Sequence, residues 1–114
     1  MPRQEFATSG YTTMYLIVYF DLPVKTKKDR KEYALFRKVL LRNGFKMMQY
    51  SVYSRYCVDN RTVERFQKIV RDELPPTGNV KMMAVTSRIY EKIESFVGRE
   101  AQESEKAPDV CAFY

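Results

Sequence analysis

MYLIVYFDLPVKTKKDRKEYALFRKVLLR, residues 14–42, combines an apolar strand pattern with a basic helix pattern, and the rest of the chain is interpreted from it. It opens with seven consecutive apolar residues, from Met14 to Phe20, and the run ends at the acid Asp21. An apolar run without polar alternation is typical of a strand that is buried on both faces, in the middle of a sheet. A carboxylate at the carboxyl end of such a strand lies at the sheet rim, where it can reach solvent, a metal ion or a substrate.

A helix over about 26–43 is predicted after this strand. Thr26 followed by Asp29 has the spacing of a capping box, and Asn43-Gly44 is a typical stop signal. At about 100° per residue, the apolar side chains of this helix gather on one side, which we expect to face the core. These side chains are Tyr33, Leu35, Phe36, Val39 and Leu40.

Positive charge is concentrated in the same stretch. Between Asp21 and Lys46 there are nine Lys and Arg residues against three acids, which accounts for the whole formal net charge of +6. Several bases form a row roughly 22 Å long on the helix side opposite the core. Concentrated positive charge on a folded segment indicates a polyanionic partner, although a solvated helix face is the alternative. The row is Lys27, Lys31, Lys38 and Arg42, flanked by Arg30 and Arg37; with Lys25 and Lys28 these are the candidate nucleic-acid-binding residues.

Composition restricts the chemistry that this chain can perform. Its 114 residues fit one domain, and no apolar run approaches the roughly 20 residues of a membrane span. The first dozen residues lack the apolar core of a signal peptide, so we expect a cytoplasmic protein. The absence of histidine excludes Ser-His and Cys-His pairs and His-containing zinc sites. Carboxylates with a hard, oxygen-liganded metal remain possible. Cys57 and Cys111, far apart and in no CxxC pattern, are expected to be buried thiols.

The rest of the chain alternates strand and helix patterns. Residues 45–58 are predicted to be extended, either as one long bent strand or as two strands with a break near Tyr53-Ser54. A second amphipathic helix is predicted over 61–74 and a strand over 80–86, and the second half of 87–98 has the pattern of a further strand. The apolar side chains of the second helix are Val63, Phe66, Ile69, Val70 and Leu74.

The predicted order is β-α-β-β-α-β, an α+β ferredoxin-like fold with an extra C-terminal strand and both helices on one sheet face. We divide the chain into a leader (1–13), a ferredoxin-like domain (14–98), a polar linker (99–107) and a C-terminal strand (108–114) that docks on its own sheet edge or a partner's. The opposite sheet face carries apolar residues and is left uncovered. Face-to-face homodimerisation is the simple way to cover it.

Three features together resemble a known family. They are the apolar strand that ends in Asp21, the stretch FDLPVKTKKDRKEYALFRKVLLRNGFKMMQYSVYSR (20–55), in which QYSVY (49–53) is a most recognisable part, and LPPTGNVKMMAVT (74–86). The combination is similar to the small CRISPR-associated adaptation protein, the dimeric partner of the spacer integrase, in the variant found with type II systems. The resemblance covers about residues 14–98.

The resemblance implies a homodimer whose two sheets face each other, with Asp21 of each protomer binding Mg²⁺ or Mn²⁺ between them. It also implies a protein that sits between two CRISPR integrase dimers and holds double-stranded DNA for insertion, and whose family members are described as metal-dependent endonucleases. The catalytic candidates carried over are Asp21, Arg30 and Tyr53. The set is only partly present, because Phe20, Lys28 and Met47 replace a Tyr and two Arg residues, and Tyr53 stands where Phe is more usual.

Three functions remain open from the sequence. The first is a nucleic-acid-binding dimer that scaffolds spacer acquisition. The second is a weak Mg-dependent endonuclease, cleaving RNA or DNA, with Asp21 as ligand, although one acid per protomer is few ligands and Asp21 also fits a rim carboxylate without metal. The third is a toxin-like endoribonuclease or an RNA-binding module, for which the expected Lys/Arg-Gly-aromatic motif is missing. Tyr50, Tyr53 and Tyr56 could stack on unpaired bases, or fill core and interface.

Overall fold

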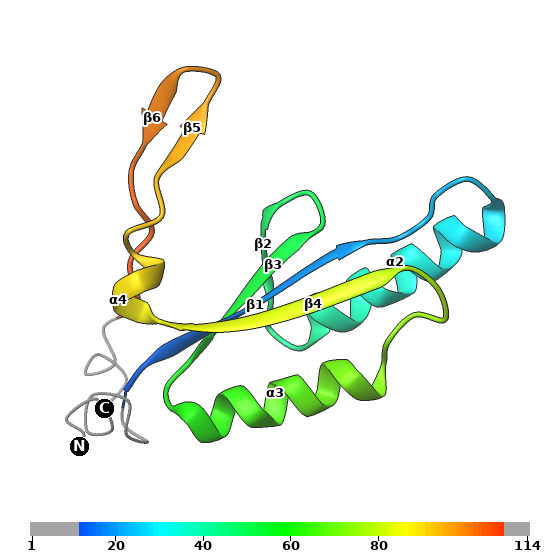
Figure 1. Ribbon diagram of the computed structural model, residues 1–114, viewed down its shortest axis with the longest axis horizontal. Coiled ribbons are helices and arrows are strands. Elements are labelled where there is room, and N and C mark those ends of the chain that lie inside the picture. Colours follow the sequence, from blue (N-terminus) through cyan, green and yellow to red (C-terminus); the bar gives the residue numbers. More distant parts are fainter. Residues whose placement is uncertain (1–11, 109–114) are drawn as a thin grey trace.

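The computed structural model describes residues 12–108 and contains a four-stranded antiparallel sheet of order β2-β3-β1-β4. Figure 1 shows the strands and helices that build it. This order and the two long helices agree with the predicted α+β, ferredoxin-like fold. The elements are β1 Met14–Asp21, α2 Lys27–Arg42, β2 Lys46–Gln49, β3 Val52–Cys57, α3 Asn60–Asp72, β4 Asn79–Thr86, α4 Ser87–Tyr90, β5 Ser95–Val97 and β6 Glu100–Gln102.

Strand β1 lies in the centre of the sheet, between β3 and β4, as its apolar run predicts. Its even-numbered side chains from Met14 to Phe20 are buried in one cluster with α2 and α3 side chains such as Phe36 and Phe66. Its odd-numbered side chains point to the other face, where Tyr15 and Ile17 are buried and Tyr19 is 37% exposed. Both helices therefore cover one face, and the other face becomes more open toward Asp21.

Helix α2 begins where the capping box predicts. The Thr26 hydroxyl accepts a hydrogen bond from the Asp29 backbone N–H at 3.0 Å, and the Asp29 carboxylate accepts one from the Thr26 N–H at 3.1 Å. Phe36, Val39 and Leu40 are buried, and Tyr33 packs against the core. The expectation for Leu35 is wrong, because this side chain is 52% exposed; it lies at the edge of the apolar face, beside a hollow that Leu74 also lines.

The extended stretch after α2 forms a hairpin whose turn lies at Tyr50-Ser51. A break near Tyr53-Ser54 is therefore wrong; these two residues lie inside β3, opposite Val18 and Ile17 of β1. Ser51 is the one non-glycine residue with positive φ (66°) among residues 12–108. The register of β2 against β3 shifts between Met47 and Gln49. The turn contains no Gly, Pro or Asn, the residues that usually mark a turn, so the sequence pattern did not reveal it.

Helix α3 and strand β4 occupy their predicted places within two residues. Val63, Phe66 and Val70 are buried, and Ile69 packs against the same cluster. Leu74 is not part of the helix core: α3 ends at Asp72, and Leu74 is 48% exposed just before Pro75-Pro76.

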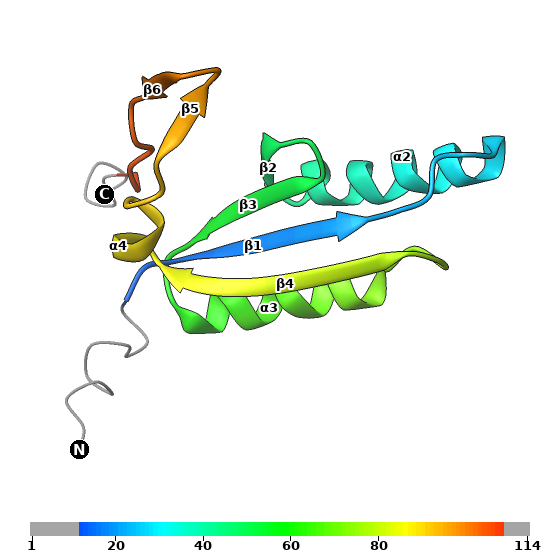
Figure 2. The same cartoon turned by 45° about the horizontal axis from the view of Figure 1, so that its top comes forward.

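Residues 87–107 contain α4 and the β5–β6 hairpin, and they lie at one end of the sheet, whereas the start of α2 lies at the other end (Figures 1 and 2). The predicted strand in the second half of 87–98 is confirmed as β5. The stretch 99–107 is not only a linker, because β6 pairs with β5 in a projecting hairpin, on which Phe96 is 57% exposed. All three residues of β6, Glu100, Ala101 and Gln102, are exposed, so no alternation of buried and exposed residues marks the strand in the sequence.

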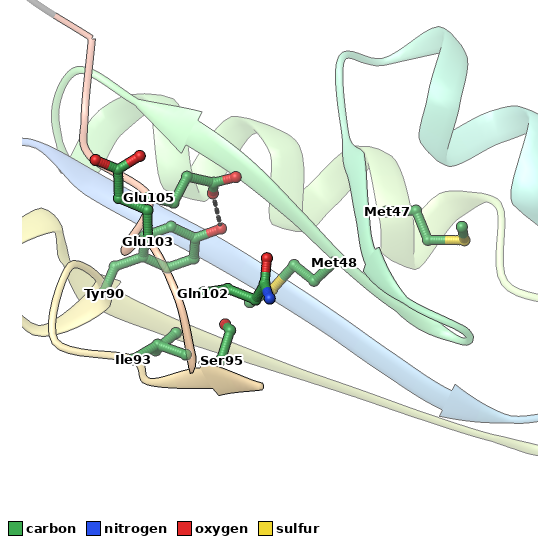
Figure 3. A pocket seen from close by; sticks show the side chains of 8 residues that line it. All are labelled: Met47, Met48, Tyr90, Ile93, Ser95, Gln102, Glu103 and Glu105. Carbon is green, nitrogen blue, oxygen red and sulfur yellow. Dashed lines mark hydrogen bonds between the residues drawn. The ribbon is translucent and has the colours of Figure 1, made fainter. Parts of the chain in front are cut away.

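Behind the hairpin the chain returns to the sheet. Figure 3 shows the Tyr90 hydroxyl donating a hydrogen bond of 2.5 Å to Glu105 Oε1, beside a pocket of about 230 Å³ that Met48 and Ile93 help to line. Glu105 also forms an ion pair with Lys46. The stacked rings of Tyr15 and Tyr90 (centroids 3.6 Å apart) cover the end of the open face.

Some predictions concern residues outside the described range. The leader expected over 1–13 lies outside it apart from residues 12 and 13, and the docking strand expected over 108–114 lies outside it apart from Pro108; Cys111 is outside it as well. Cys57 is buried, as expected for a structural thiol. Among residues 12–108, no helix combines the length and apolar character needed to cross a membrane.

Candidate nucleic-acid interface and metal site

The basic side chains of α2 form one exposed face. The helix holds seven Lys and Arg residues, all of which the sequence singles out for nucleic-acid binding, and all seven are exposed. The ion pairs present in residues 12–108, Lys46–Glu105 and Lys68–Asp72, both lie away from this helix. Within residues 12–108, no ion pair therefore neutralises the positive charge of this face. The face consists of Lys27, Lys28, Arg30, Lys31, Arg37, Lys38 and Arg42.

Arg30 has a defined local role at the start of this face. Its Nη1 donates hydrogen bonds to the backbone carbonyls of Val24 (3.2 Å) and Lys25 (3.0 Å). These two bonds fix the loop between β1 and α2, so that exposed Lys25 is held next to the helix bases. Arg30 contributes charge and also positions the loop that follows Asp21.

Tyr53, a catalytic candidate from the family resemblance, lies inside the protein. Its ring is 1% exposed and stacks on Phe20, with centroids 5.8 Å apart. Its hydroxyl accepts a hydrogen bond from Arg37 Nε at 3.0 Å. In the protomer, Tyr53 therefore packs the core and orients Arg37, on the opposite side of the sheet from Tyr19.

Asp21 is exposed at the carboxyl end of β1, as predicted for a rim carboxylate, and it pairs in register with Asn79 of β4. The turn before β4 passes very close to it. A Cβ on Gly78 (φ +93°) would lie 2.8 Å from the Asp21 carbonyl oxygen and 2.6 Å from a Leu22 methyl carbon. Only glycine fits this backbone conformation and this close approach, so Gly78 sets the position of the rim.

A hollow of about 250 Å³ opens beside Asp21. Tyr19 and Lys81, which face each other in register on β1 and β4, line it together with Tyr50 and Ser51 of the β2–β3 turn. The sequence reasoning did not identify Lys81 or Asn79. Lys81 is the one charged residue in strand β4, and its odd position places it on the same face as Asp21.

The oxygen donors at this rim suit a hard divalent cation. The Asp21 carboxylate and the Asn79 amide oxygen are ligands that Mg²⁺ and Mn²⁺ accept. Within the described part of the chain, no group of three or more His, Cys, Asp or Glu side chains is placed to hold a metal ion. Among the residues that the structure describes, Asp21 is the one acid that lines this hollow, and a second carboxylate would come from another copy of the chain, as the family resemblance implies.

The sequence that folds into this basic helix, rim acid and open sheet face is similar to sequences of known proteins. The family model described as CRISPR associated protein Cas2 matches residues 14–93. A protein of Paracidovorax avenae is 44% identical over 101 residues, which is 89% of this chain and 94% of that protein. Relatives from Flavobacterium psychrophilum (38%; 84% of each chain) and Parvibaculum lavamentivorans (42%; 83% and 94%) are similar too. All three carry the name CRISPR-associated endoribonuclease Cas2.

Proposed function

We propose a function for this chain from its family, because the chain belongs to the CRISPR associated protein Cas2 family. It acts as a homodimer that binds double-stranded DNA through α2, bridges CRISPR integrase dimers and holds the DNA fragment for integration into the array. The alternative is a metal-dependent endonuclease that uses Asp21.

The observation that carries the proposal is the exposed basic face of α2, whose Lys and Arg side chains form no ion pair within residues 12–108. The exposed Lys and Arg side chains run along α2 from Lys27 to Arg42, where they can contact phosphates at regular intervals, and a dimer presents two such helices. Contacts of this kind position a duplex without reading its sequence, and their strength falls steeply with salt. A protein that must accept DNA fragments of any sequence needs binding of this kind.

The open sheet face supports the homodimer. Toward Asp21 this face leaves Tyr19 37% and Met83 47% exposed, and α4 covers only its other end. A second copy related by a two-fold axis would cover these side chains with the same ones of its own sheet. That arrangement would also bring the two Asp21 carboxylates toward each other.

Metal-dependent endonuclease activity is the second candidate, favoured by the name endoribonuclease that the relatives carry and by the exposed rim carboxylate. Mg²⁺ or Mn²⁺ bound there would activate water and neutralise charge on a phosphate. Asp21, and Asn79 beside it, are the residues that would hold the ion. Lys81 would bind a substrate phosphate, and Arg30 would keep the loop after Asp21 in place.

Spacer integration reconstituted from purified integrase and DNA tests the proposal. Wild type and Asp21→Ala are compared side by side, with mass measurements to follow the dimer. Equal integration by both proteins is the expected result for a scaffold. A protein that stays monomeric, or that ignores duplex DNA even in dilute buffer, would overturn the proposal; integration lost only in Asp21→Ala would favour the nuclease.

A further inference from the structure

Arg37 differs from the other bases of α2, because a buried side chain holds its guanidinium. Its Nε donates a hydrogen bond of 3.0 Å to the hydroxyl of Tyr53, whose ring is 1% exposed. Among the bases of the α2 face, Arg30 is the other one that hydrogen-bonds within residues 12–108, and its bonds go to backbone carbonyls of the preceding loop. The remaining bases make no hydrogen bond or ion pair in that range. Arg37 is therefore the base of this face that is tied to the core.

Packing fixes the position of the Tyr53 ring. Tyr53 lies in β3 opposite Val18 of β1, in the core cluster that α2 and α3 cover. Its ring stacks on Phe20 with centroids 5.8 Å apart, and Phe20 meets Phe36 of α2 edge to face at 5.2 Å. The hydroxyl therefore has a fixed position relative to the sheet. The guanidinium of Arg37, which bonds to this hydroxyl, is held in place with it.

The outer end of the Arg37 guanidinium is free to bind a ligand. The bond to Tyr53 uses the Nε–H group, and the N–H groups of Nη1 and Nη2 have no hydrogen-bond partner within residues 12–108. The two Nη atoms of a planar guanidinium form a fork that matches two oxygens of one phosphate. Arg37 is exposed on the helix side of the sheet, so a second copy that covers the opposite sheet face leaves it accessible.

We propose that Arg37 anchors the DNA duplex on α2 by binding one phosphate with both Nη atoms, and that Tyr53 is the positioning residue for this contact. The inference rests on the proposed function, because it assigns a role within the surface that would hold the duplex. An exposed lysine loses rotamer freedom when it binds a phosphate, whereas a guanidinium that is already held loses less. The duplex is therefore held firmly at Arg37, and the lysines adjust to the phosphates on either side.

A structural role of the same hydrogen bond makes a different prediction. A buried tyrosine hydroxyl needs a hydrogen-bond partner, and Arg37 meets this need even without DNA. If the bond served only the fold, Tyr53→Phe would change the free energy of unfolding and leave the affinity for DNA unchanged. If Tyr53 positions the guanidinium, Tyr53→Phe weakens DNA binding although every charge of the helix remains.

The test measures the affinity of the intact protein for a labelled blunt duplex by fluorescence anisotropy over a series of salt concentrations. Tyr53→Phe should weaken binding about fivefold, because the phosphate contact must then order the Arg37 side chain. The slope of log affinity against log salt should not change, since no charge is lost. Arg37→Lys leaves the core intact and should give the same loss with the same slope, because an ammonium has neither the Nε nor the fork.

A double variant identifies the residue through which Tyr53 acts. Arg37→Ala should weaken binding more than Tyr53→Phe and should lower the magnitude of the salt slope by about 0.9, the value for one phosphate contact. Adding Tyr53→Phe to Arg37→Ala should weaken binding no further, because the guanidinium is already absent. The loss in Tyr53→Phe concerns affinity alone, so saturating nucleic acid should conceal it.

Two matched controls separate this role from general effects. Tyr33→Phe removes another tyrosine hydroxyl of the same layer, which shares a hydrogen bond of 2.9 Å with Ser51 Oγ and not with a base, and it should bind DNA like wild type. Lys38→Ala removes the neighbouring base, and its loss of affinity should add in full to that of Tyr53→Phe.

The possible failures can be told apart. Tyr53→Phe or Arg37→Lys with wild-type affinity overturns the inference and leaves the proposed function standing. Tyr53→Phe that weakens binding equally with and without Arg37→Ala also overturns it, because the hydroxyl would then act elsewhere. If Tyr53→Phe is no longer a folded dimer by urea unfolding and mass measurement, the surface variant Arg37→Lys decides. Wild type that does not bind the duplex refutes the proposed function, and the inference with it.

Discussion

The hydroxyl of Tyr90 donates a hydrogen bond of 2.5 Å to the carboxylate of Glu105, and this bond ties the chain after the β5–β6 hairpin to the sheet (Figure 3). Ser54 Oγ lies 2.9 Å from the same hydroxyl, in a buried position. A second bond secures the segment, since the Ala107 N–H donates to Glu91 Oε2 at 2.8 Å. Hydrogen bonds therefore hold the chain segments before and after the exposed hairpin to each other and to the sheet.

This relationship predicts a pH-dependent stability. Burial raises the pKa of Glu105, but hydrogen bonds from Lys46 and Tyr90 outweigh it, so the net pKa lies below its ordinary value. A lowered folded-state pKa contributes stability that is present above the unfolded-state pKa of about 4.3 and is lost as pH falls through the folded-state value. Glu105→Gln should therefore be less stable than wild type at neutral pH and equal to it in strong acid. Urea unfolding across acidic pH measures the difference; a constant gap would contradict the prediction.

The buried tyrosines beside Glu105 make the stability of this region depend on alkaline pH as well. Burial raises the pKa of Tyr15 to about 12 and raises that of Tyr90 as well. A raised pKa contributes stability below the unfolded-state pKa of about 10, which is lost as pH rises above it. Tyr90→Phe removes one titrating group and also leaves buried Ser54 without this partner, so at neutral pH it should cost about 1–2 kcal/mol of unfolding free energy. Urea unfolding of both proteins from neutral to alkaline pH measures this cost, and the gap should narrow as pH rises above 10 or so.

The sequence predicted the parts of the fold that local physics dictates. Seven apolar residues placed β1 in the sheet centre, and a capping box placed the start of α2. It did not predict the Tyr50-Ser51 turn, because a positive φ at a serine is imposed by contacts with Phe20 and Tyr33 and not by residue type. Local preference was overruled by packing there.

The candidate site was likewise predicted only in part from the sequence. Asp21 and the α2 bases were found, because a strand end and a helix face are periodic features of the sequence. The environments of Tyr53 and Lys81 depend on strand register: Tyr53 lies opposite Val18 and points into the core, whereas Lys81 lies opposite Tyr19 and points to the hollow. The Tyr90–Glu105 bond joins residues 15 apart through tertiary packing, which no local pattern encodes.

Gly78 offers a test of how the rim at Asp21 is built. Gly78→Ala places a Cβ 2.6 Å from Leu22 Cδ2 at a positive φ, so backbone strain and overpacking should together cost about 3 kcal/mol. Gly98→Ala is the matched control, since Gly98 also has positive φ (63°) but nothing within 4 Å of its Cβ position; it should cost about 1 kcal/mol. Thermal and urea unfolding compare the two. Equal losses would mean that the close approach at Asp21 does not constrain the rim.

The basic face of α2 is tested by charge reversal. Replacing Lys27, Lys31 and Lys38 together by Glu should abolish duplex binding at physiological salt while the dimer persists. The slope of log affinity against log salt should fall in magnitude by about 0.9 for each phosphate that the variant no longer neutralises. Reversal of three exposed bases elsewhere, Arg61, Arg88 and Arg99, changes net charge equally and should have little effect. Electrophoretic mobility or anisotropy titrations decide. Binding unchanged in the first variant, or weakened equally in both, would rule out α2 as the DNA surface.

Cleavage is expected to separate Asp21 from the other catalytic candidates. If the protein hydrolyses phosphodiester bonds with Mg²⁺ or Mn²⁺, Asp21→Asn should abolish cleavage without changing the dimer or the unfolding free energy, because an exposed amide of the same shape removes only the charged oxygen ligand. At saturating substrate, Tyr53→Phe should cleave like wild type, since its hydroxyl is buried against Arg37, on the opposite side of the sheet from Tyr19. Gel assays on labelled RNA and DNA, with and without chelator, measure both. Cleavage that survives in Asp21→Asn would point to a contaminating nuclease, whereas cleavage abolished in Tyr53→Phe alone would return the hydroxyl to the reaction and contradict the assignment made from its burial.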